Sequence, residues 1–358
     1  MRTKNNRLVL TGGGTAGHVI GHIALLDLFR KHSWDLLYIG SSGIEKKLIE
    51  IEGVEFKSIK VGKLRRYFSF ENFIDVFKII FGTVQSIFYL IKFQPAAVFS
   101  KGGFVSVPVA VAAWLLKIPI LTHESDYSPG LATKIIQHIA HTVFYSFPET
   151  EKYLDSEKAI FSGSPVRLDL HKGNRIKGLE LCEFPLAPNK PILLVMGGSL
   201  GAVKVNSVLN EALPVLVESY FVIHLTGSGK KIDFTHENYR GFSFLNSELR
   251  DVLACADLVV SRAGANAIFE LLALAKPMLL IPLEAGSRGD QPLNASSFEK
   301  ENWAMVIREK SLNPETLVAK IDELYATKER MQEYQKKYHK FGTSAHDTIC
   351  SQIAKKMV

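Results

Sequence analysis

The fold of this chain is decided by the stretch Arg7-Leu-Val-Leu-Thr-Gly-Gly-Gly-Thr-Ala-Gly-His-Val19. A short apolar run, Leu8 to Leu10, ends in three consecutive glycines, and a helix-like apolar stretch follows His18. This order is typical of a strand, a glycine turn and a helix. Glycine lets backbone N–H groups approach an anion closely, and the start of a helix adds unpaired N–H groups and the positive end of its dipole. We therefore expect a cradle the size of a diphosphate, with His18 beside it.

Composition indicates an ordinary globular protein of two domains. The chain has 358 residues, of which 47% are hydrophobic and 22% charged. The three cysteines, Cys182, Cys255 and Cys350, are far apart, which argues for a reducing cytoplasm and against a disulfide frame or a zinc site. The N-terminal apolar run is too short for a signal peptide. The whole net charge of +7 falls within residues 1–101, and such a basic surface suits nucleic acid, an anionic membrane or an acidic substrate.

Apolar strands alternate with helical segments along the first half, which predicts a parallel sheet. We expect strands at 35–40, 54–59, 96–100, 118–122 and 142–145, and helices at 17–31 and 44–51. At Pro191 the opening pattern repeats, with a strand at 192–196, a second glycine turn at 197–202 and a helix at 204–217. Further strands are expected at 220–225, 241–245, 258–261 and 277–281, with a long polar loop at 282–294.

The pattern loosens between residues 162 and 190, which indicates a boundary between two similar sheets whose strand ends face a cleft. We predict a first domain at 1–163 and a second at 164–341. A last helix at 342–358 is expected to pack back on the first domain.

The region from Lys63 to Lys92 is unusually apolar and aromatic. Its phenylalanines are Phe68, Phe70, Phe73, Phe77, Phe81 and Phe88, and a basic collar of Lys60, Lys63, Arg65 and Arg66 precedes it. The longest uncharged part, 79–91, is shorter than the ~20 residues that cross a bilayer. A helix with surplus apolar residues and a basic collar suits the membrane interface. The alternative is a helix enclosed in the core. Nucleic-acid binding is disfavoured, because no recognition helix or repeated aromatic-basic motif is present.

The glycines Gly12, Gly14 and Gly17 match the dinucleotide-binding pattern, yet the rest of that site is missing. The second strand ends Tyr38-Ile-Gly-Ser-Ser42, without the carboxylate that would hold a ribose. Residues of the second half suit a sugar nucleotide better. Glu270 could accept from two ribose hydroxyls, and the amides of Gln291 and Asn294 could read sugar hydroxyls. The ordinary alternatives are a helix-surface glutamate and two amides that cap a loop.

Seven motifs occur in an order that resembles the MurG family, the bacterial transferases that add N-acetylglucosamine to lipid I and make lipid II. The motifs are GGGTAGH at 12–18, KGGFVSVP at 101–108, HESD at 123–126, SPVR at 164–167, GGSLGA at 197–202, AGANAIFELLALAKPMLLIPL at 263–283 and SRGDQPLNA at 287–295. The resemblance covers nearly the whole chain. It implies an α/β fold of the GT-B type, with two Rossmann-like parallel-sheet domains. It also implies an inverting transfer from UDP-N-acetylglucosamine to the muramyl 4-hydroxyl, with no cofactor and no essential metal.

The resemblance also assigns roles to single residues. Donor-binding positions would be Arg167, Gly198, Ser199, Phe244, Leu245, Ala265, Asn266, Glu270, Gln291 and Asn294. The first glycine loop then becomes the acceptor diphosphate site, with Gly13, Gly14, Thr15, Gly102, Gly103 and His123. We expect His18 to be the general base, because an unperturbed histidine has a pKa of ~6.5. Asp126 and Glu124 are alternative bases, and His18 could instead only bind a phosphate or order its loop.

The chain departs from the common family pattern at several positions. Asp126 and Phe104 stand where many members have asparagine and tyrosine, Thr133 stands where they have asparagine, and Asp290 where they have glutamine. The resemblance places the protein peripherally on the cytoplasmic side of the cell membrane. It implies work in peptidoglycan synthesis, cell shape and cell division, with other cell-wall synthesis proteins as partners. Two other functions stay open: a GT-B transferase for another lipid acceptor, and a non-catalytic nucleotide-binding subunit at the membrane surface.

Overall fold

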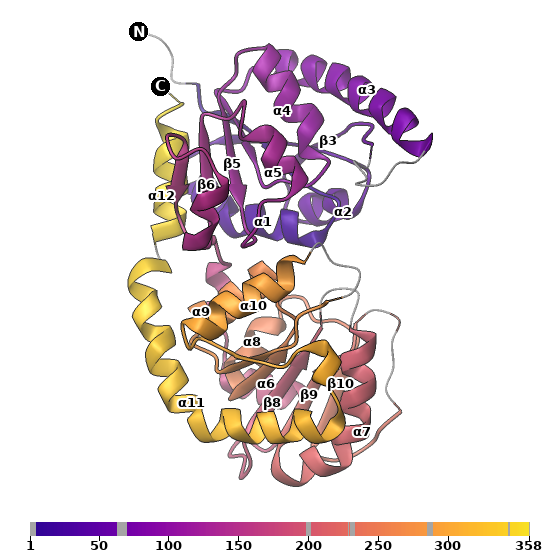
Figure 1. Cartoon of the computed structure of the whole chain (residues 1–358). Helices are drawn as coiled ribbons and strands as arrows, with labels where there is room; N and C mark the ends of the chain where they lie inside the picture. Colours follow the sequence, from indigo (N-terminus) through magenta and orange to yellow (C-terminus); the bar gives the residue numbers. More distant parts are fainter. Residues whose placement is uncertain are drawn as a thin grey trace. The chain divides into compact units, whose positions relative to one another are not determined.

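The computed structural model describes residues 5–62, 70–197, 202–227, 229, 233–284, 289–342 and 344–357. The chain forms two compact units (Figure 1). The first comprises Met1–Val166 with Phe341–Val358, and the second comprises Arg167–Lys340. The first break therefore falls three residues later than the sequence suggests, so Ser164 belongs to the first unit.

The first unit is built on a seven-stranded parallel sheet in the order β3-β2-β1-β4-β5-β6-β7. Its strands are β1 (Arg7–Thr11), β2 (Asp35–Gly40), β3 (Glu55–Ser58), β4 (Ala97–Ser100), β5 (Ile120–Glu124), β6 (Thr142–Tyr145) and β7 (Ala159–Phe161). The helices are α1 (Ala16–Lys31), α2 (Ile44–Ile51), α3 (Phe70–Phe93), α4 (Ser106–Leu115), α5 (Leu131–Ile136), the 3₁₀ helix η1 (Pro148–Tyr153) and the C-terminal α12 (Ser344–Ala354).

Successive side chains of each strand point to opposite faces of the sheet, so this unit has an apolar cluster on each face. Leu8 and Leu10 join the cluster that includes Ile349 and Ile353 of α12, whereas Val9 lies in the opposite cluster. The side chains of a strand point to opposite faces in turn, so one strand supplies both clusters. A parallel sheet covered on both faces requires nearly continuous apolar strands, which explains the runs that the sequence shows.

The second unit contains a six-stranded parallel sheet in the order β10-β9-β8-β11-β12-β13. Its strands are β8 (Ile192–Met196), β9 (Phe221–Leu225), β10 (Tyr239–Phe242), β11 (Leu258–Ser261), β12 (Met278–Leu280) and β13 (Met305–Val306). The helices are α6 (Arg175–Leu181), α7 (Val203–Ser219), α8 (Leu249–Cys255), α9 (Ala265–Ala273), α10 (Asp290–Lys300), α11 (Pro314–Gly342), and the 3₁₀ helices η2 (Leu168–Lys172) and η3 (Glu309–Ser311).

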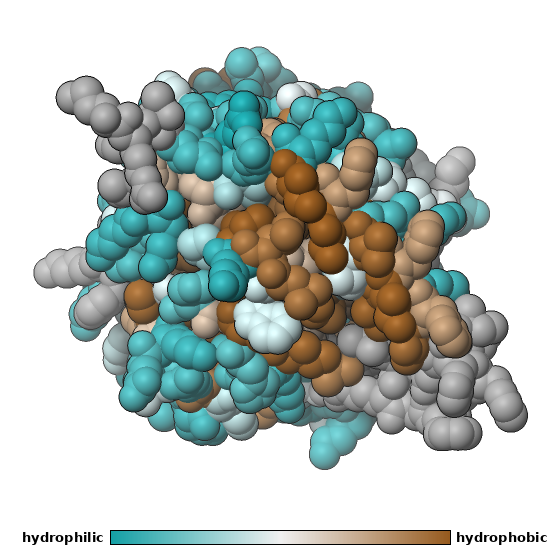
Figure 2. Space-filling model, turned by 90° about the horizontal axis from the view of Figure 1, so that it is seen from above, coloured by the Kyte–Doolittle hydropathy of each residue, from teal (hydrophilic) through white to brown (hydrophobic). Residues whose placement is uncertain are grey.

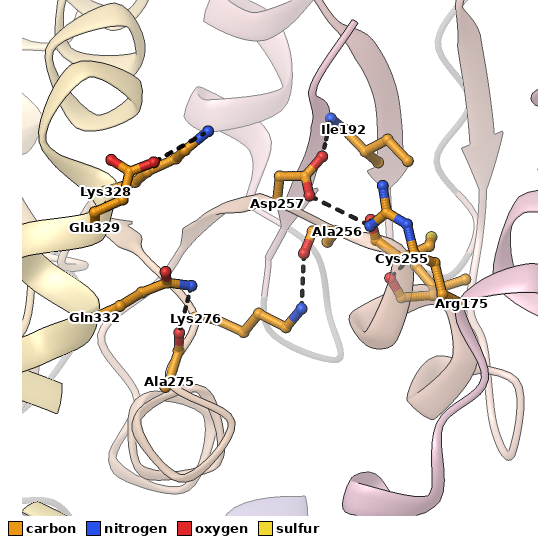
Figure 3. A network of polar contacts seen from close by, with 11 residues as sticks. Arg175, Ile192, Cys255, Ala256, Asp257, Ala275, Lys276, Lys328, Glu329 and Gln332 are labelled. Atoms are coloured by element: carbon orange, nitrogen blue, oxygen red, sulfur yellow. Dashed lines mark hydrogen bonds and ion pairs between the residues drawn. The ribbon is translucent and has the colours of Figure 1, made fainter. Parts of the chain in front are cut away.

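The interpretation of residues 162–190 as a loose linker is wrong for its central part. Residues 168–172 and 175–181 form η2 and α6, which pack against α8. The Arg175 guanidinium donates to the Cys255 carbonyl at 2.7 Å and contacts the Asp257 carboxylate at 3.3 Å (Figure 3). The other Asp257 oxygen accepts from the Ile192 N–H at 2.8 Å, so one side chain joins α6 to the start of β8. These contacts are long-range, and local composition does not reveal them.

Two other boundaries differ from the sequence prediction. The polar loop expected at 282–294 ends earlier, because α10 begins at Asp290 and takes Gln291 and Asn294 into its first turns. The strand expected at 241–245 is shifted, since β10 ends at Phe242. Phe244 and Leu245 therefore follow the strand and lie beyond the carboxyl end of the sheet.

Helix α3 presents a large apolar surface. Its exposed side chains are Val76, Phe77, Ile80, Phe81, Val84, Phe88 and Ile91, and Trp114 and Leu115 of α4 extend the patch (Figure 2). The spacing of these α3 residues follows one helix face. The other face contributes Leu90 to the core, with Ile87 and Phe93 packed beside it. By length and composition, Asp75–Phe93 could span a bilayer, and 17% of that window is buried. Phe68 lies outside the described residues, as do the side chains of Phe70 and Phe73.

Candidate functional site

Two glycine loops meet at the carboxyl edge of the first sheet. Strand β1 pairs with β2 on one side and β4 on the other, so the chain order of the strands reverses beside it. Loops at such a reversal flank a crevice where α/β folds bind ligands. Gly103, with a φ of +78°, lies against Gly13 so closely that an added Cβ would stand 2.1 Å from the Gly13 carbonyl oxygen. The loops thus pack backbone against backbone.

His18 is held at this junction by the second loop. It lies in the first turn of α1 and is half-buried. Its Nδ1 lies 3.0 Å from the carbonyl oxygen of Lys101. A carbonyl can only accept, so Nδ1 donates and carries the proton of the neutral ring, which leaves the lone pair on Nε2. This is the tautomer that a base acting through Nε2 requires.

The side chain of Lys101 is buried beneath the loops, 2% exposed. Its Nζ lies 2.7 Å from His123 Nδ1 and 2.8 Å from Ser125 Oγ. Burial lowers the pKa of Lys101 to about 7, and the nearby Glu124 and Asp126 carboxylates limit the fall. The sequence placed Lys101 in the loop that flanks the acceptor diphosphate site, but it did not predict that the side chain is buried against His123 and Ser125.

His123 is a buried residue of the first unit. It is 1% exposed, and both ring nitrogens are bound within the protein. Burial, with the charge of Lys101, holds the pKa of His123 well below its usual range, so the ring is neutral. Nδ1 accepts from Lys101, and Nε2 donates to the Gly163 carbonyl at 3.0 Å. In this structure His123 supports Lys101 and the Gly163 carbonyl, and a direct contact with the acceptor stays a prediction.

The Glu124 carboxylate holds the 126–133 segment in place through hydrogen bonds. Its oxygens accept from the N–H groups of Asp126 and Gly130, each at 3.0 Å, and from the Thr133 hydroxyl at 2.6 Å. All three of these hydrogen bonds hold the carboxylate against its own loop, so its oxygens are already engaged within the protein. These contacts do not favour Glu124 as the base. Asp126, the other alternative, is half-buried beside it.

The first glycine loop is only partly open to a ligand. Gly14 and Thr15 are exposed, whereas Gly13 and Gly102 are buried. The Gly14 N–H points at Glu45 Oε2, 3.4 Å away, and Glu45 also accepts from the Ser41 N–H at 3.0 Å. A buried carboxylate therefore occupies one position that the sequence assigned to a phosphate oxygen. Sequence reasoning missed Glu45, whose place below the loop depends on the pairing of β1 with β2.

In the second unit, Glu270 and Arg167 form a two-point ion pair. Arg167 Nε lies 2.7 Å from Glu270 Oε1, and Nη2 lies 3.1 Å from Oε2. Both side chains are partly exposed, and the pair joins the start of the unit to α9. Ala265 is buried at the start of α9, and Asn266 is half-buried beside it. The sequence predicted Arg167 and Glu270 as donor-binding residues but not their contact with each other.

The two amides predicted to read the sugar have different surroundings. Asn294 is fully buried, and its Nδ2 donates to the Ala263 carbonyl at 3.1 Å, so it holds the turn before α9. Its direct contact with a sugar is not supported by this structure. Gln291 is half-buried, and its Oε1 accepts from the Leu283 N–H at 2.9 Å. Phe244 is exposed and Leu245 half-buried.

Some predicted features cannot be placed. Gly198 and Ser199, expected at the donor diphosphate, lie outside the described residues. Among the residues that the structure describes, no group of three or more His, Cys, Asp or Glu side chains is arranged to hold a metal ion.

Comparison with family models identifies both halves of the chain. Residues 8–145 match the glycosyltransferase family 28 N-terminal domain, and residues 192–349 match the glycosyltransferase family 28 C-terminal domain. A relative from Geobacillus thermodenitrificans is 48% identical over 94% of this chain and 95% of its own length. One from Bacillus cereus is 46% identical over 97% of this chain and 99% of its own. Both are named UDP-N-acetylglucosamine--N-acetylmuramyl-(pentapeptide) pyrophosphoryl-undecaprenol N-acetylglucosamine transferase.

Solved structures agree on the fold. The structure of MurG from Acinetobacter baumannii superposes with a TM-score of 0.73 at 22% identity, covering 98% of this chain and 99% of the other. The calicheamicin glycosyltransferase CalG4 gives a TM-score of 0.74 at 13% identity, covering 100% of this chain and 99% of the other. The prediction of a GT-B fold with two Rossmann-like parallel-sheet domains is confirmed.

The close contact between the glycine loops predicts that a side chain at Gly103 destabilises the protein. Gly103→Ala should destabilise the protein by about 3 kcal/mol, because the new Cβ meets the Gly13 carbonyl and the backbone keeps a positive φ. The matched control is Gly53→Ala, which has a φ of +69° but no atom within 4 Å of the added Cβ. It should cost only about 1 kcal/mol. Urea unfolding of both variants measures the difference, and equal losses would contradict the loop contact.

The lowered pKa of Lys101 predicts that the free energy of unfolding depends on pH. Below about pH 7 its amine is protonated in both the folded and the unfolded chain. Between pH 7 and the ordinary value of 10.5, the folded protein releases the proton while the unfolded chain keeps it, so stability rises with pH. Relative to Lys101→Met, the wild-type protein should gain about 2 kcal/mol from pH 7 to pH 9.

Urea unfolding at both pH values measures this gain. The control Lys47→Met removes an exposed lysine of the same unit and should follow the wild-type curve. A constant difference between wild type and Lys101→Met across this range would show that the buried amine does not titrate there.

Proposed function

This chain belongs to the family of UDP-N-acetylglucosamine--N-acetylmuramyl-(pentapeptide) pyrophosphoryl-undecaprenol N-acetylglucosamine transferases, and we propose that it catalyses that transfer in peptidoglycan synthesis. The donor is UDP-N-acetylglucosamine. The acceptor is lipid I, and the product is lipid II. The observation that carries the proposal is a near-full-length similarity to named transferases that spans both units.

The reaction is a single inverting displacement. The 4-oxygen of the muramyl sugar forms a bond to the anomeric carbon of the donor while the bond from that carbon to UDP breaks. The electron pair of the broken bond leaves with the diphosphate, and the hydroxyl proton passes to a base. The sequence resemblance assigns Gly198 and Ser199 to the leaving diphosphate, where backbone N–H groups offset growing charge without a metal.

The donor would bind at the carboxyl edge of the second sheet. The exposed Phe244 and neighbouring Leu245 suit the uracil ring. Glu270 keeps acceptor capacity for ribose hydroxyls, because a carboxylate has about four lone-pair sites and Arg167 takes two of them. Of the two amides assigned to the sugar, Gln291 is half-buried and would contact it, while Asn294 would act through the Ala263 turn. Asn266 would lie near the uracil ring.

His18 is the group in the first unit best suited to act as the base. Its Nδ1 hydrogen bond orients the ring and leaves the lone pair on Nε2. The ring is half-buried, so a substrate hydroxyl can reach it. Glu124 already accepts three hydrogen bonds and holds the loop that carries Asp126. The acceptor diphosphate would lie at the exposed Gly14 and Thr15, where α1 begins.

The acceptor carries a polyprenyl tail, so the enzyme must work at a membrane. The α3 patch with Trp114 and Leu115 supplies an apolar surface, and the basic residues of the first 101 positions supply attraction to anionic lipid. One face of α3 is packed in the core with Leu90, which suits a helix lying at the interface. We therefore propose peripheral attachment to the cytoplasmic face of the cell membrane.

Turnover of purified protein tests the function. The chain should convert UDP-N-acetylglucosamine and a lipid I analogue to the disaccharide product, with the same rate in EDTA. His18→Ala should lower kcat by 10²- to 10⁴-fold with little change in donor affinity. His138→Ala, which removes an exposed histidine of the same unit, is the control and should keep wild-type kcat. An unchanged kcat in His18→Ala would exclude His18 as the base.

Liposome flotation tests the attachment. A Phe77→Ser, Phe81→Ser double variant should lose most binding to vesicles containing anionic lipid, because both side chains are exposed at the centre of the patch. The control Leu168→Ser, Leu186→Ser removes two exposed apolar side chains of the second unit and should float like the wild type. Undiminished flotation of the phenylalanine variant would contradict docking through α3.

A further inference from the structure

A cavity of about 560 Å³ lies beside the first glycine loop and has no role in the chemistry above. Gly14 and Phe104 border it on the loop side, the 41–45 turn forms another wall, and Asp75 and Lys78 of α3 close it. Its volume falls in the range of small-molecule sites, roughly 300–1,000 Å³. The cavity therefore joins the loop that contains the proposed diphosphate site to the helix that carries the apolar patch.

One carboxylate oxygen of Asp75, a residue that lines this cavity, lacks a hydrogen-bond donor within the described part of the chain. The residue is 5% exposed. Its Oδ1 accepts from Lys78 Nζ at 3.1 Å, while its Oδ2 has no hydrogen-bond partner among the residues that the structure describes. Oδ2 is also out of contact with solvent, so a ligand reaches it only if the side chain turns toward the cavity. A buried carboxylate oxygen without a donor is costly, which favours such a turn when a ligand supplies an N–H group.

The charges around the cavity do not suit a phosphate. Its lining residues include two acidic residues, Asp75 and Glu45, two lysines, Lys60 and Lys78, and two serines, Ser41 and Ser42. The two lysines and the two acidic residues balance, so the lining offers no net positive charge to a dianion. A peptide suits the cavity better, because it offers N–H donors to Asp75 and carbonyl or carboxylate oxygens to the lysines and serines.

We propose that this cavity binds the peptide of the lipid-linked acceptor, with Asp75 accepting from one of its N–H groups. The inference rests on the proposed function, whose acceptor carries a pentapeptide in the names of the relatives. The position of the cavity supports it. A peptide attached to the muramyl sugar starts beside the diphosphate, and Gly14 belongs both to the proposed diphosphate loop and to the cavity wall. The cavity then selects acceptors by their peptide, separately from the diphosphate and the lipid.

The test compares two acceptors with the full chain at saturating UDP-N-acetylglucosamine. One is a lipid I analogue with the pentapeptide, and the other has the same lipid, diphosphate and sugar but a methylamide in place of the peptide. The measured quantity is the ratio of their kcat/KM values. Asp75→Asn should lower this ratio about tenfold. A carboxylate accepts through both oxygens, whereas the amide replaces one of them with an NH₂ group that cannot accept from the peptide N–H.

Two further variants show whether a change in the kcat/KM ratio comes from the cavity or from a loss of folded protein. Ser42→Trp fills the cavity from an exposed position and should lower the ratio similarly. Asp27→Asn removes an exposed carboxylate from α1 of the same unit and should leave the ratio unchanged. An unchanged ratio in both cavity variants would overturn the inference, whatever their absolute rates. An equal gain on both acceptors in Asp75→Asn would indicate a phosphate in the cavity and would overturn it too.

Turnover of the two acceptors by the wild-type protein distinguishes a failure of this inference from a failure of the proposed function. Turnover of both acceptors with equal kcat/KM would overturn the peptide site alone. No turnover of either acceptor would overturn the proposed function, and the peptide site with it.

Discussion

The site in the first unit depends on the reversal of strand order beside β1. Because β1 pairs with both β2 and β4, the loops after β1 and β4 leave the sheet at the same edge. They then approach so closely that Gly103 has no room for a side chain against the Gly13 carbonyl. This backbone contact brings the Lys101 carbonyl within hydrogen-bond distance of His18. The glycines therefore serve the packing of two loops first, and only Gly14 and Thr15 remain exposed for a ligand.

Buried ionisable groups hold these loops in place. Glu124 accepts three hydrogen bonds from the 126–133 segment, Glu45 lies below Gly14, and Lys101 joins His123 to Ser125. A buried polar network stabilises a unique arrangement only when its members find partners, and these groups do. The proposed base, His18, differs from these groups because its ring is only half-buried and its Nδ1 is oriented by the Lys101 carbonyl.

Helix α3 combines two tasks that need different residues. Its outer face is a continuous apolar patch, and its inner face packs in the core. At its N-terminal end Asp75 and Lys78 turn to the cavity beside Gly14. Under the proposed function, a lipid-linked substrate would keep its tail in the bilayer while its head enters the protein, and a helix with an apolar face and a polar end suits both. The positive charge of the first 101 residues would favour the proposed attachment to anionic lipid.

The sequence by itself determined the parts that depend on local pattern. Apolar runs predicted the central strands, glycine turns predicted both loops, and the repeat at Pro191 predicted two sheets, because strand and turn signals are carried by neighbouring residues. Tertiary structure decided what depends on distant residues. Helix α6 is held by Arg175 contacts to Cys255 and Asp257, and no local signal marked residues 168–181. Likewise His123 and Asn294 looked like ligand contacts, because polar residues after a strand can face either a ligand or the core. Only the pairing of strands and the packing of loops directs them inward, where His123 supports Lys101 and Asn294 supports the Ala263 turn.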